Sequence, residues 1–165
     1  NPDDVARKVG IGAVVFSDLS VRRDTDVSFE WERMLDFEGQ TGPYLQYAHA
    51  RICSVIRKYG HEPDGNADYS LLKFPEEFGL AKKLLDYPEK IKAAAELNEP
   101  YIVSAYLLDL AGLFSTYFQK YKSPGDKILT DNPELTKARV SLAWCVRAVL
   151  KSGLNILGID ALEKM

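Results

Sequence analysis

Residues 38–51 read E-G-Q-T-G-P-Y-L-Q-Y-A-H-A-R. The Gly-Pro pair at positions 42 and 43 suits the first turn of a helix, where the N–H group that proline lacks would have no partner in any case. Apolar residues then recur at helical spacing on one stripe: Leu45, Ala48, Ile52, Val55, Ile56 and Tyr59. Gly60 is the expected stop. The pattern predicts one long amphipathic helix over residues 41–59.

Three larger side chains share a face of this helix, because Tyr44, Tyr47 and Arg51 stand at positions i, i+3 and i+7. Two aromatic rings beside a guanidinium are suited to stacking unpaired bases and holding a nearby phosphate, as in the recognition of single-stranded RNA. The same spacing also fits a helix that buries both tyrosine rings in a core. The residues alone leave both interpretations open.

Helix signals dominate the rest of the chain. Asn1 and Pro2 predict a helix that ends at Gly10, and a second short helix is expected over residues 12–19. Residues 21–29 lack a helical period and predict a loop, with a short strand at residues 27–29 as an option. Further helices are expected at residues 31–37, 75–85, 88–97, 100–121 and 132–153, the last stopped by Gly153. The prediction is an all-α protein, a bundle of about five to seven helices with antiparallel neighbours.

Composition is that of an ordinary soluble globular protein, with 46% apolar and 27% charged residues. We expect no membrane span, because no apolar run approaches the ~20 residues that one needs. The polar opening is unlike a signal peptide, so a cytoplasmic location is expected. Cys53 and Cys145 fall among apolar neighbours and predict buried free thiols, with a disulfide or metal pair as the alternative.

The net charge of −3 hides an uneven distribution. Residues 1–38 carry −4, so the remaining 127 residues carry +1. Three windows that are helical by pattern contain no carboxylate: residues 39–61, 110–125 and 135–159. Because local potential decides whether a phosphate backbone is attracted, these windows predict one shared cationic face. Merely solvated bases are the alternative.

The chain shows no catalytic or metal-binding pattern. His49 and His61 belong to no spacing that a zinc or di-iron site requires, and no phosphate-binding glycine loop is present. The candidates for a catalytic pair of carboxylates are Asp24 with Asp26 and Glu76 with Glu77, which are expected to be solvated. A small helical enzyme is therefore disfavoured.

The longer sequence context points to a family. The string at residues 38–51, with G-I-G-A-V-V-F-S-D-L-S at residues 10–20 and V-S-F-E-W-E-R-M-L-D-F at residues 27–37, resembles the C-terminal region of the arginyl-tRNA synthetases. The stretch K-S-G-L-N-I-L-G-I-D-A-L-E-K-M at residues 151–165 is similar to that family's closing stretch, including its terminal Met. The resemblance implies a connecting segment from the catalytic domain over residues 1–37. It implies an all-helical anticodon-binding domain, called DALR, over residues 38–165.

The resemblance also implies roles for single residues. In the family, the helix that bears P-Y-L-Q-Y-A-H-A-R contacts the anticodon loop. Tyr47 is therefore the first candidate for base stacking, supported by Tyr44 and Arg51. His49 is expected to hold helix geometry or a phosphate.

Two other segments add candidates. F-S-T-Y-F-Q-K-Y at residues 114–121 is similar to a family segment that contributes further aromatics, which makes Tyr117 and Tyr121 candidates. K-S-P-G replaces the usual Cys-Pro after this segment, so a displaced helix end is expected. Met165 matches a family residue near the anticodon pocket. A core role for Tyr117 and a frayed end for Met165 are the alternatives.

The function implied by the resemblance is recognition of the anticodon arm of arginine tRNA. The parent enzyme, an arginine-tRNA ligase, joins arginine to its tRNA with ATP and Mg. The sequences of the H-I-G-H and K-M-S-K-S type are absent here, so no cofactor and no catalysis are expected of this part. The expected partners are tRNA and the catalytic domain of the same chain, in a monomer. The alternative is a helical protein-protein interaction module anchored by its tyrosines.

Overall fold

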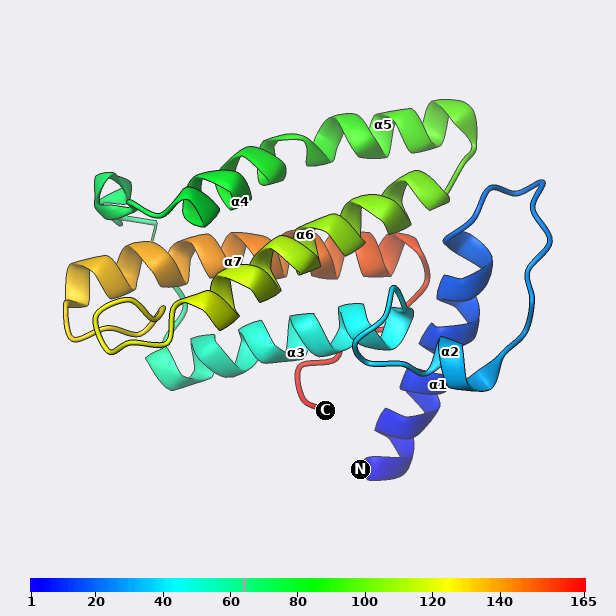
Figure 1. Cartoon of the computed structure of the whole chain (residues 1–165), viewed down its shortest axis with the longest axis horizontal. Helices are drawn as coiled ribbons and strands as arrows, with labels where there is room; N and C mark the ends of the chain where they lie inside the picture. The colour runs from blue at the N-terminus through cyan, green and yellow to red at the C-terminus, as the bar shows by residue number, and fades with distance from the viewer. Residues whose placement is uncertain (64) are drawn as a thin grey trace.

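The computed structural model describes residues 1–63 and 65–165, and none of these residues forms a strand. The elements in chain order are α1 (Pro2–Leu19), α2 (Trp31–Met34), α3 (Gly42–Tyr59), the 3-10 helix η1 (Tyr69–Leu71), α4 (Pro75–Leu85), α5 (Tyr87–Leu97), α6 (Tyr101–Lys120) and α7 (Pro133–Ile156). The all-α prediction is confirmed (Figure 1). The option of a strand at residues 27–29 is wrong, because these residues are irregular and exposed.

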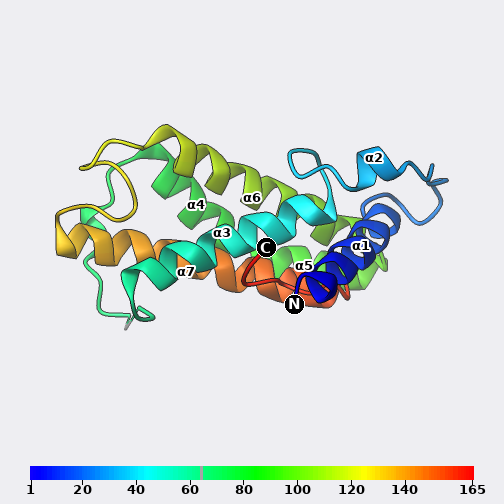
Figure 2. The same cartoon turned by 90° about the horizontal axis from the view of Figure 1, so that it is seen from below.

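The long helices lie along one axis. Helix α7 packs against α3 and α6, while α4 and α5 pack against α6 as a further layer (Figure 1). Helix α1 packs against α3 and crosses the end of the bundle at which α3 begins. In both views the two ends of the chain lie close together beside α3 (Figures 1 and 2). The start and the close of this sequence therefore meet at one helix.

Most helix ends follow the sequence signals. The Thr41 hydroxyl accepts a hydrogen bond from the Tyr44 backbone N–H at 3.1 Å, and Gly60 ends α3 with a left-handed φ of 99°. The Asn132 side chain accepts hydrogen bonds from two backbone N–H groups in the first turn of α7. These caps satisfy donors that the helix itself leaves unpaired. The predicted boundaries of α3 and the predicted start of α7 are confirmed.

Two predicted glycine stops are wrong. Helix α1 continues through Gly10, and α7 continues through Gly153. A Cβ built at Gly153 would lie 2.5 Å from Cδ2 of Leu107, which is fully buried in α6. Gly153 therefore allows α7 to approach α6 closely, and it does not end the helix.

This contact predicts the effect of a substitution. Overpacking costs about 1–3 kcal/mol, and alanine in a helix gains about 1 kcal/mol over glycine. Gly153→Ala is therefore expected to lower the free energy of unfolding by about 1 kcal/mol. In the control Gly79→Ala, the new Cβ meets nothing within 4 Å. That control should gain up to about 1 kcal/mol. Urea denaturation measures both, and equal effects would contradict the contact.

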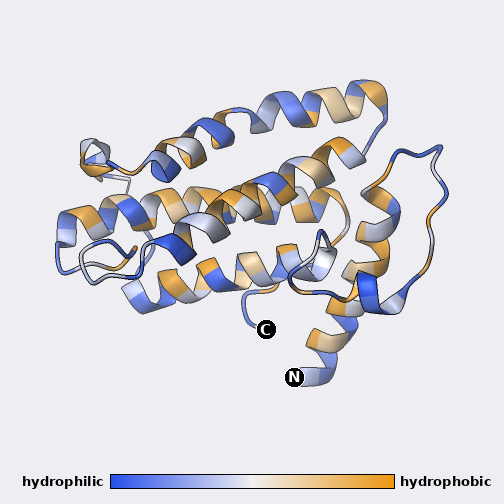
Figure 3. Ribbon diagram, in the orientation of Figure 1, coloured by the Kyte–Doolittle hydropathy of each residue, from blue (hydrophilic) through white to orange (hydrophobic). Residues whose placement is uncertain are grey.

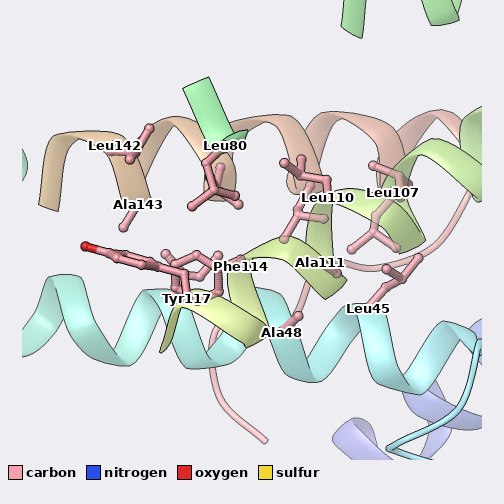
Figure 4. Close-up of a cluster of buried hydrophobic side chains, with 14 of the residues drawn as sticks. Leu45, Ala48, Leu80, Leu107, Leu110, Ala111, Phe114, Tyr117, Leu142 and Ala143 are labelled. Atoms are coloured by element: carbon pink, nitrogen blue, oxygen red, sulfur yellow. The ribbon is translucent and has the colours of Figure 1, made fainter. Parts of the chain in front are cut away.

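The core is centred on α6. Leu45 of α3 and Leu107, Leu110 and Phe114 of α6 are fully buried together (Figure 4). Leu150 of α7 is fully buried in the same cluster. Along the long helices hydrophobic positions alternate with hydrophilic ones, as expected of helices with one face on a core (Figure 3). Helices α3, α6 and α7 are thus held together by one shared apolar core.

The two cysteines divide between the core and the surface. Both are free thiols, as predicted. Cys53 is buried in α3, but Cys145 is exposed on α7, so the burial prediction is wrong for Cys145. The buried stripe of α7 runs through Leu142, Val146 and Leu150 and leaves Cys145 outside it.

Helix α6 is long and apolar enough to cross a membrane by length and composition, contrary to the expectation that no such run exists. In this structure 44% of its most apolar window is buried inside the protein. One such helix is weak evidence for a membrane span, because the core helix of a soluble protein passes the same test.

A buried charge lies where α4, α6 and α7 meet. Glu77 is fully buried, so the expectation that it is solvated is wrong. Its Oε1 accepts hydrogen bonds from Arg139 Nε at 2.7 Å and from the Tyr117 hydroxyl at 2.9 Å. Its Oε2 accepts from the backbone N–H groups of residues 73 and 74. Arg139 also donates to the backbone carbonyls of residues 125–127. The pair ties three helices and a loop together.

Candidate nucleic-acid interface

The predicted aromatic and basic residues of α3 lie together at the surface. Tyr47 is 40% exposed, and the Arg51 guanidinium stands 4.5 Å from the centre of its ring. Tyr44 is half-buried, with its hydroxyl 3.3 Å from the Ser115 hydroxyl of α6. One turn of α3 thus presents a ring and a cation side by side, while Tyr44 is held against the neighbouring helix.

Phe118 of α6 is a member of this group that the sequence did not single out. Its half-buried ring lies 5.3 Å from the Arg51 guanidinium, so Arg51 contacts an aromatic ring on each of two helices. Such contacts are worth about 0.5–1 kcal/mol at exposed sites. The sequence places Phe118 on the wide apolar stripe of the long helix, which hides its contact with Arg51.

Two concave surfaces meet at Tyr47. The α3–α6 groove, of ≈ 680 Å³, has a mainly polar lining that includes Tyr44, Tyr47, Arg51, Ser115, Thr116 and Gln119. The apolar hollow, of ≈ 940 Å³, lies between α1, α2 and the end of the sequence, and its lining includes Val5, Val9, Trp31, Phe37, Tyr47 and Met165. Tyr47 and Phe37 line both, so a ligand that contacts Tyr47 can reach a polar and an apolar surface at once.

Met165 reaches the same place from the other end of the sequence. It is 44% exposed and lines the apolar hollow with Tyr47. Its polarizable thioether is suited to packing against a flat aromatic group. The structure therefore brings four predicted residues to one region: Tyr44, Tyr47, Arg51 and Met165.

Tyr117 lies away from this region, so its prediction as a tRNA-binding residue is corrected. It is only 1% exposed and lies within the core cluster (Figure 4). Burial, with the Glu77 carboxylate beside it, raises the pKa of the Tyr117 hydroxyl. A sealed ring cannot stack on a base, so Tyr117 serves the core, the alternative that its sequence left open.

Tyr121 does not join the Tyr47 group. Its ring stacks on Phe74 at 3.8 Å between centres, and its hydroxyl donates to Glu76 at 2.6 Å. Hydrogen bonds from Lys120 and Tyr121 lower the pKa of the Glu76 carboxyl to about 2. Tyr121 lines a separate small hollow with Phe118 and Lys122, at the C-terminal end of α6.

The prediction of one shared cationic face is contradicted for three of its cations. Carboxylates from residues 62–77 pair with three of its cations: Lys120 with Glu76 at 2.6 Å, Arg139 with Glu77 at 2.7 Å, and Arg147 with Glu62 at 3.0 Å. Among the described residues, Arg51 forms no ion pair and keeps its charge beside Tyr47. The positive charge beside Tyr47 is therefore that of Arg51, whereas three cations of the acid-free windows are already paired with carboxylates.

Comparisons with known proteins identify the family of this chain. Residues 45–165 match the family described as DALR anticodon binding domain. Arginine-tRNA ligase of Clostridioides difficile is 40% identical over the whole chain, which spans 28% of that relative. Arginine-tRNA ligase of Pseudomonas syringae pv. tomato is 40% identical over 161 residues, which span 27% of its length.

Solved structures give the same picture. The structure of Thermus thermophilus arginyl-tRNA synthetase matches with a TM-score of 0.91 and 38% identity, over 100% of this chain and 28% of that one. Arginyl-tRNA synthetase of Plasmodium falciparum matches with a TM-score of 0.80 at 24% identity, which shows the fold alone. This chain, which spans little more than a quarter of these relatives, belongs to the DALR anticodon-binding domain family.

Proposed function

We propose that this chain recognises the anticodon arm of arginine tRNA, as the tRNA-binding part of an arginine-tRNA ligase. The observation that carries the proposal is the exposed Tyr47 ring beside the Arg51 guanidinium, at the junction of a polar groove and an apolar hollow. A ring and a cation so placed suit an unpaired base and its phosphate.

The recognition proceeds by stacking and charge. A base unstacked from the anticodon loop lies against Tyr47 and packs on Met165 in the apolar hollow. Arg51 holds a neighbouring phosphate, and its contact with Phe118 keeps the guanidinium on the groove side of α3. Tyr44, fixed by Ser115, supports the wall of the groove.

The rest of the chain fits a module that acts with a larger enzyme. Residues 1–37 connect the module at residues 38–165 to a catalytic domain, and the packing of α1 on α3 supports a firm attachment. ATP and Mg serve the catalytic domain, where arginine is joined to the tRNA. The module itself performs no chemistry, and the enzyme works as a monomer in the cytoplasm.

The rival function is a protein-interaction module, favoured by the apolar lining around Trp31, Phe37 and Met165. Salt dependence separates the two functions. Binding of arginine tRNA by the full-length protein should weaken as salt rises, with a log-log slope near −0.7 for each single-stranded phosphate neutralised. An apolar protein interface need not respond in this way. A salt-independent affinity, or equal affinity for a tRNA of another amino acid, would contradict the proposal.

A further inference from the structure

Helix α3 has a second polar face, distinct from the one that carries Tyr47. Gln46, His49 and Arg57 stand at positions i, i+3 and i+11, which places them on one side of the helix. All three contact backbone carbonyl oxygens of the segment formed by residues 158–165. This segment begins at Gly158, whose left-handed φ of 74° turns the chain out of α7.

The three contacts are short and follow one another along the segment. Gln46 Nε2 donates to the Asp160 carbonyl at 2.9 Å. His49 Nδ1 lies 2.8 Å from the Leu162 carbonyl oxygen, and Arg57 Nη1 donates to the Glu163 carbonyl at 2.9 Å. Outside a helix these carbonyls have no ladder partner, so side chains of α3 supply the hydrogen bonds. These three contacts hold the 158–165 segment against α3.

Burial makes the first two contacts firm. Gln46 is fully buried and His49 is 1% exposed. A carbonyl oxygen can only accept, so the Nδ1 nitrogen of His49 carries the proton. Burial lowers the pKa of His49, which keeps the ring neutral near pH 7. The buried Cys53 sulfur lies 3.8 Å from Nδ1 and 3.9 Å from Nε2 of the same ring. Neither side chain is available to a ligand.

Gln46 also reaches the opposite wall of the apolar hollow. Its Nε2 lies 3.3 Å from the Lys8 carbonyl of α1, whose Val5 and Val9 line that wall. A Cβ at Gly12 would lie 3.0 Å from the Gln46 amide, so the glycine leaves room for this side chain. One buried amide therefore links both walls of the hollow to α3.

We propose that Gln46, His49 and Arg57 are positioning residues that hold the 158–165 segment on α3 so that Met165 stands opposite α1 and beside Tyr47. The inference rests on the proposed function, because the hollow so formed is the one that receives the unstacked base. Met165 follows the anchored Leu162 carbonyl by three residues and Glu163 by two, which leaves little freedom in its placement. His49 thus acts on the base only through Met165.

Matched variants of the full-length protein test this coupling by their affinity for arginine tRNA. His49→Leu removes the donor to Leu162, and Met165→Ala removes the thioether. Each is expected to weaken binding by roughly 2- to 10-fold, the range of a sulfur-aromatic contact. The double variant should be no weaker than either single one, since residues that act as a unit are non-additive. His49→Asn, which keeps an amide N–H near the Nδ1 position, should restore most of the affinity.

A second variant avoids the core in case His49→Leu fails to fold. Arg57 is exposed, and Arg57→Met keeps most of its stem while removing the donor to Glu163. We expect it to weaken binding through Met165 without changing the salt slope, whereas loss of a phosphate contact would reduce that slope. Lys58→Met removes the same charge one residue away and is the control.

The outcomes separate the two proposals. Additive losses in His49→Leu and Met165→Ala, or a reduced salt slope in Arg57→Met, would overturn the positioning role while tRNA binding stands. A salt-independent affinity, or equal affinity for a tRNA of another amino acid, would contradict the proposed function itself and the positioning role with it. If His49 had a purely structural role, His49→Leu would lower the melting temperature. Its loss of tRNA affinity would then be the same whether or not Met165 is replaced.

Discussion

Replacing Glu77 with Leu is expected to lower the free energy of unfolding by about 3–5 kcal/mol, the cost of leaving a buried charge without its partner. Arg139 is 3% exposed and would keep its carbonyl contacts but lose its carboxylate. The Tyr117 hydroxyl and two backbone N–H groups would lose their acceptor as well. Urea denaturation followed by circular dichroism measures the loss.

The double variant Glu77→Leu with Arg139→Met is the sharper comparison. A buried ion pair can often be replaced by apolar residues with little net cost, because the desolvation of two charges is removed along with their attraction. The double variant should therefore recover much of the stability lost in Glu77→Leu. A double variant as unstable as the sum of the two single ones would contradict this account of the pair.

Tyr47→Ala is expected to weaken binding of arginine tRNA by ~1–3 kcal/mol, the usual cost of losing a base-aromatic stack. The variant also removes the ring under the Arg51 guanidinium, so the cation loses one of its two aromatic contacts. Tyr47→Phe keeps the ring and should bind nearly as well as the parent. Equilibrium binding at fixed salt provides the measurement.

A tyrosine elsewhere on the surface is the matched control. Tyr69 of η1 is 50% exposed and lines neither the α3–α6 groove nor the apolar hollow. Tyr69→Ala should leave the affinity unchanged. An equal loss in both variants would mean that the assay reports stability rather than contact with a base.

Local signals in the sequence predict the helices well because caps and stripes are local. Thr41, Gly60 and Asn132 set helix ends through hydrogen bonds within a few residues. The glycines were harder, since Gly10 and Gly153 look alike as stop signals. At Gly153 the missing Cβ lets α6 approach, and Leu107 lies 46 residues away from Gly153 in the sequence. A Cβ at Gly10 would meet nothing within 4 Å, so no close approach accounts for that glycine.

The site was predictable in part, for the same reason. Tyr44, Tyr47 and Arg51 follow from one helical face, whereas the fate of Tyr117 depends on Glu77, forty residues earlier. Three cations of the predicted cationic face are paired because their partners, Glu62, Glu76 and Glu77, lie outside the acid-free windows in sequence but contact them in the fold. The charges within a window of sequence do not predict ion pairs with distant segments.

The most direct test of tRNA recognition combines a substitution in the protein with a substitution in the RNA. The affinity of the full-length protein is measured for arginine tRNA and for the same tRNA with a substituted anticodon-loop base, in the parent and in Tyr47→Ala. If the base stacks on Tyr47, the base substitution lowers the affinity of the parent protein for the tRNA. It lowers the affinity of Tyr47→Ala little, because both changes remove the same contact. An equal penalty in both proteins would contradict the placement of the base at Tyr47.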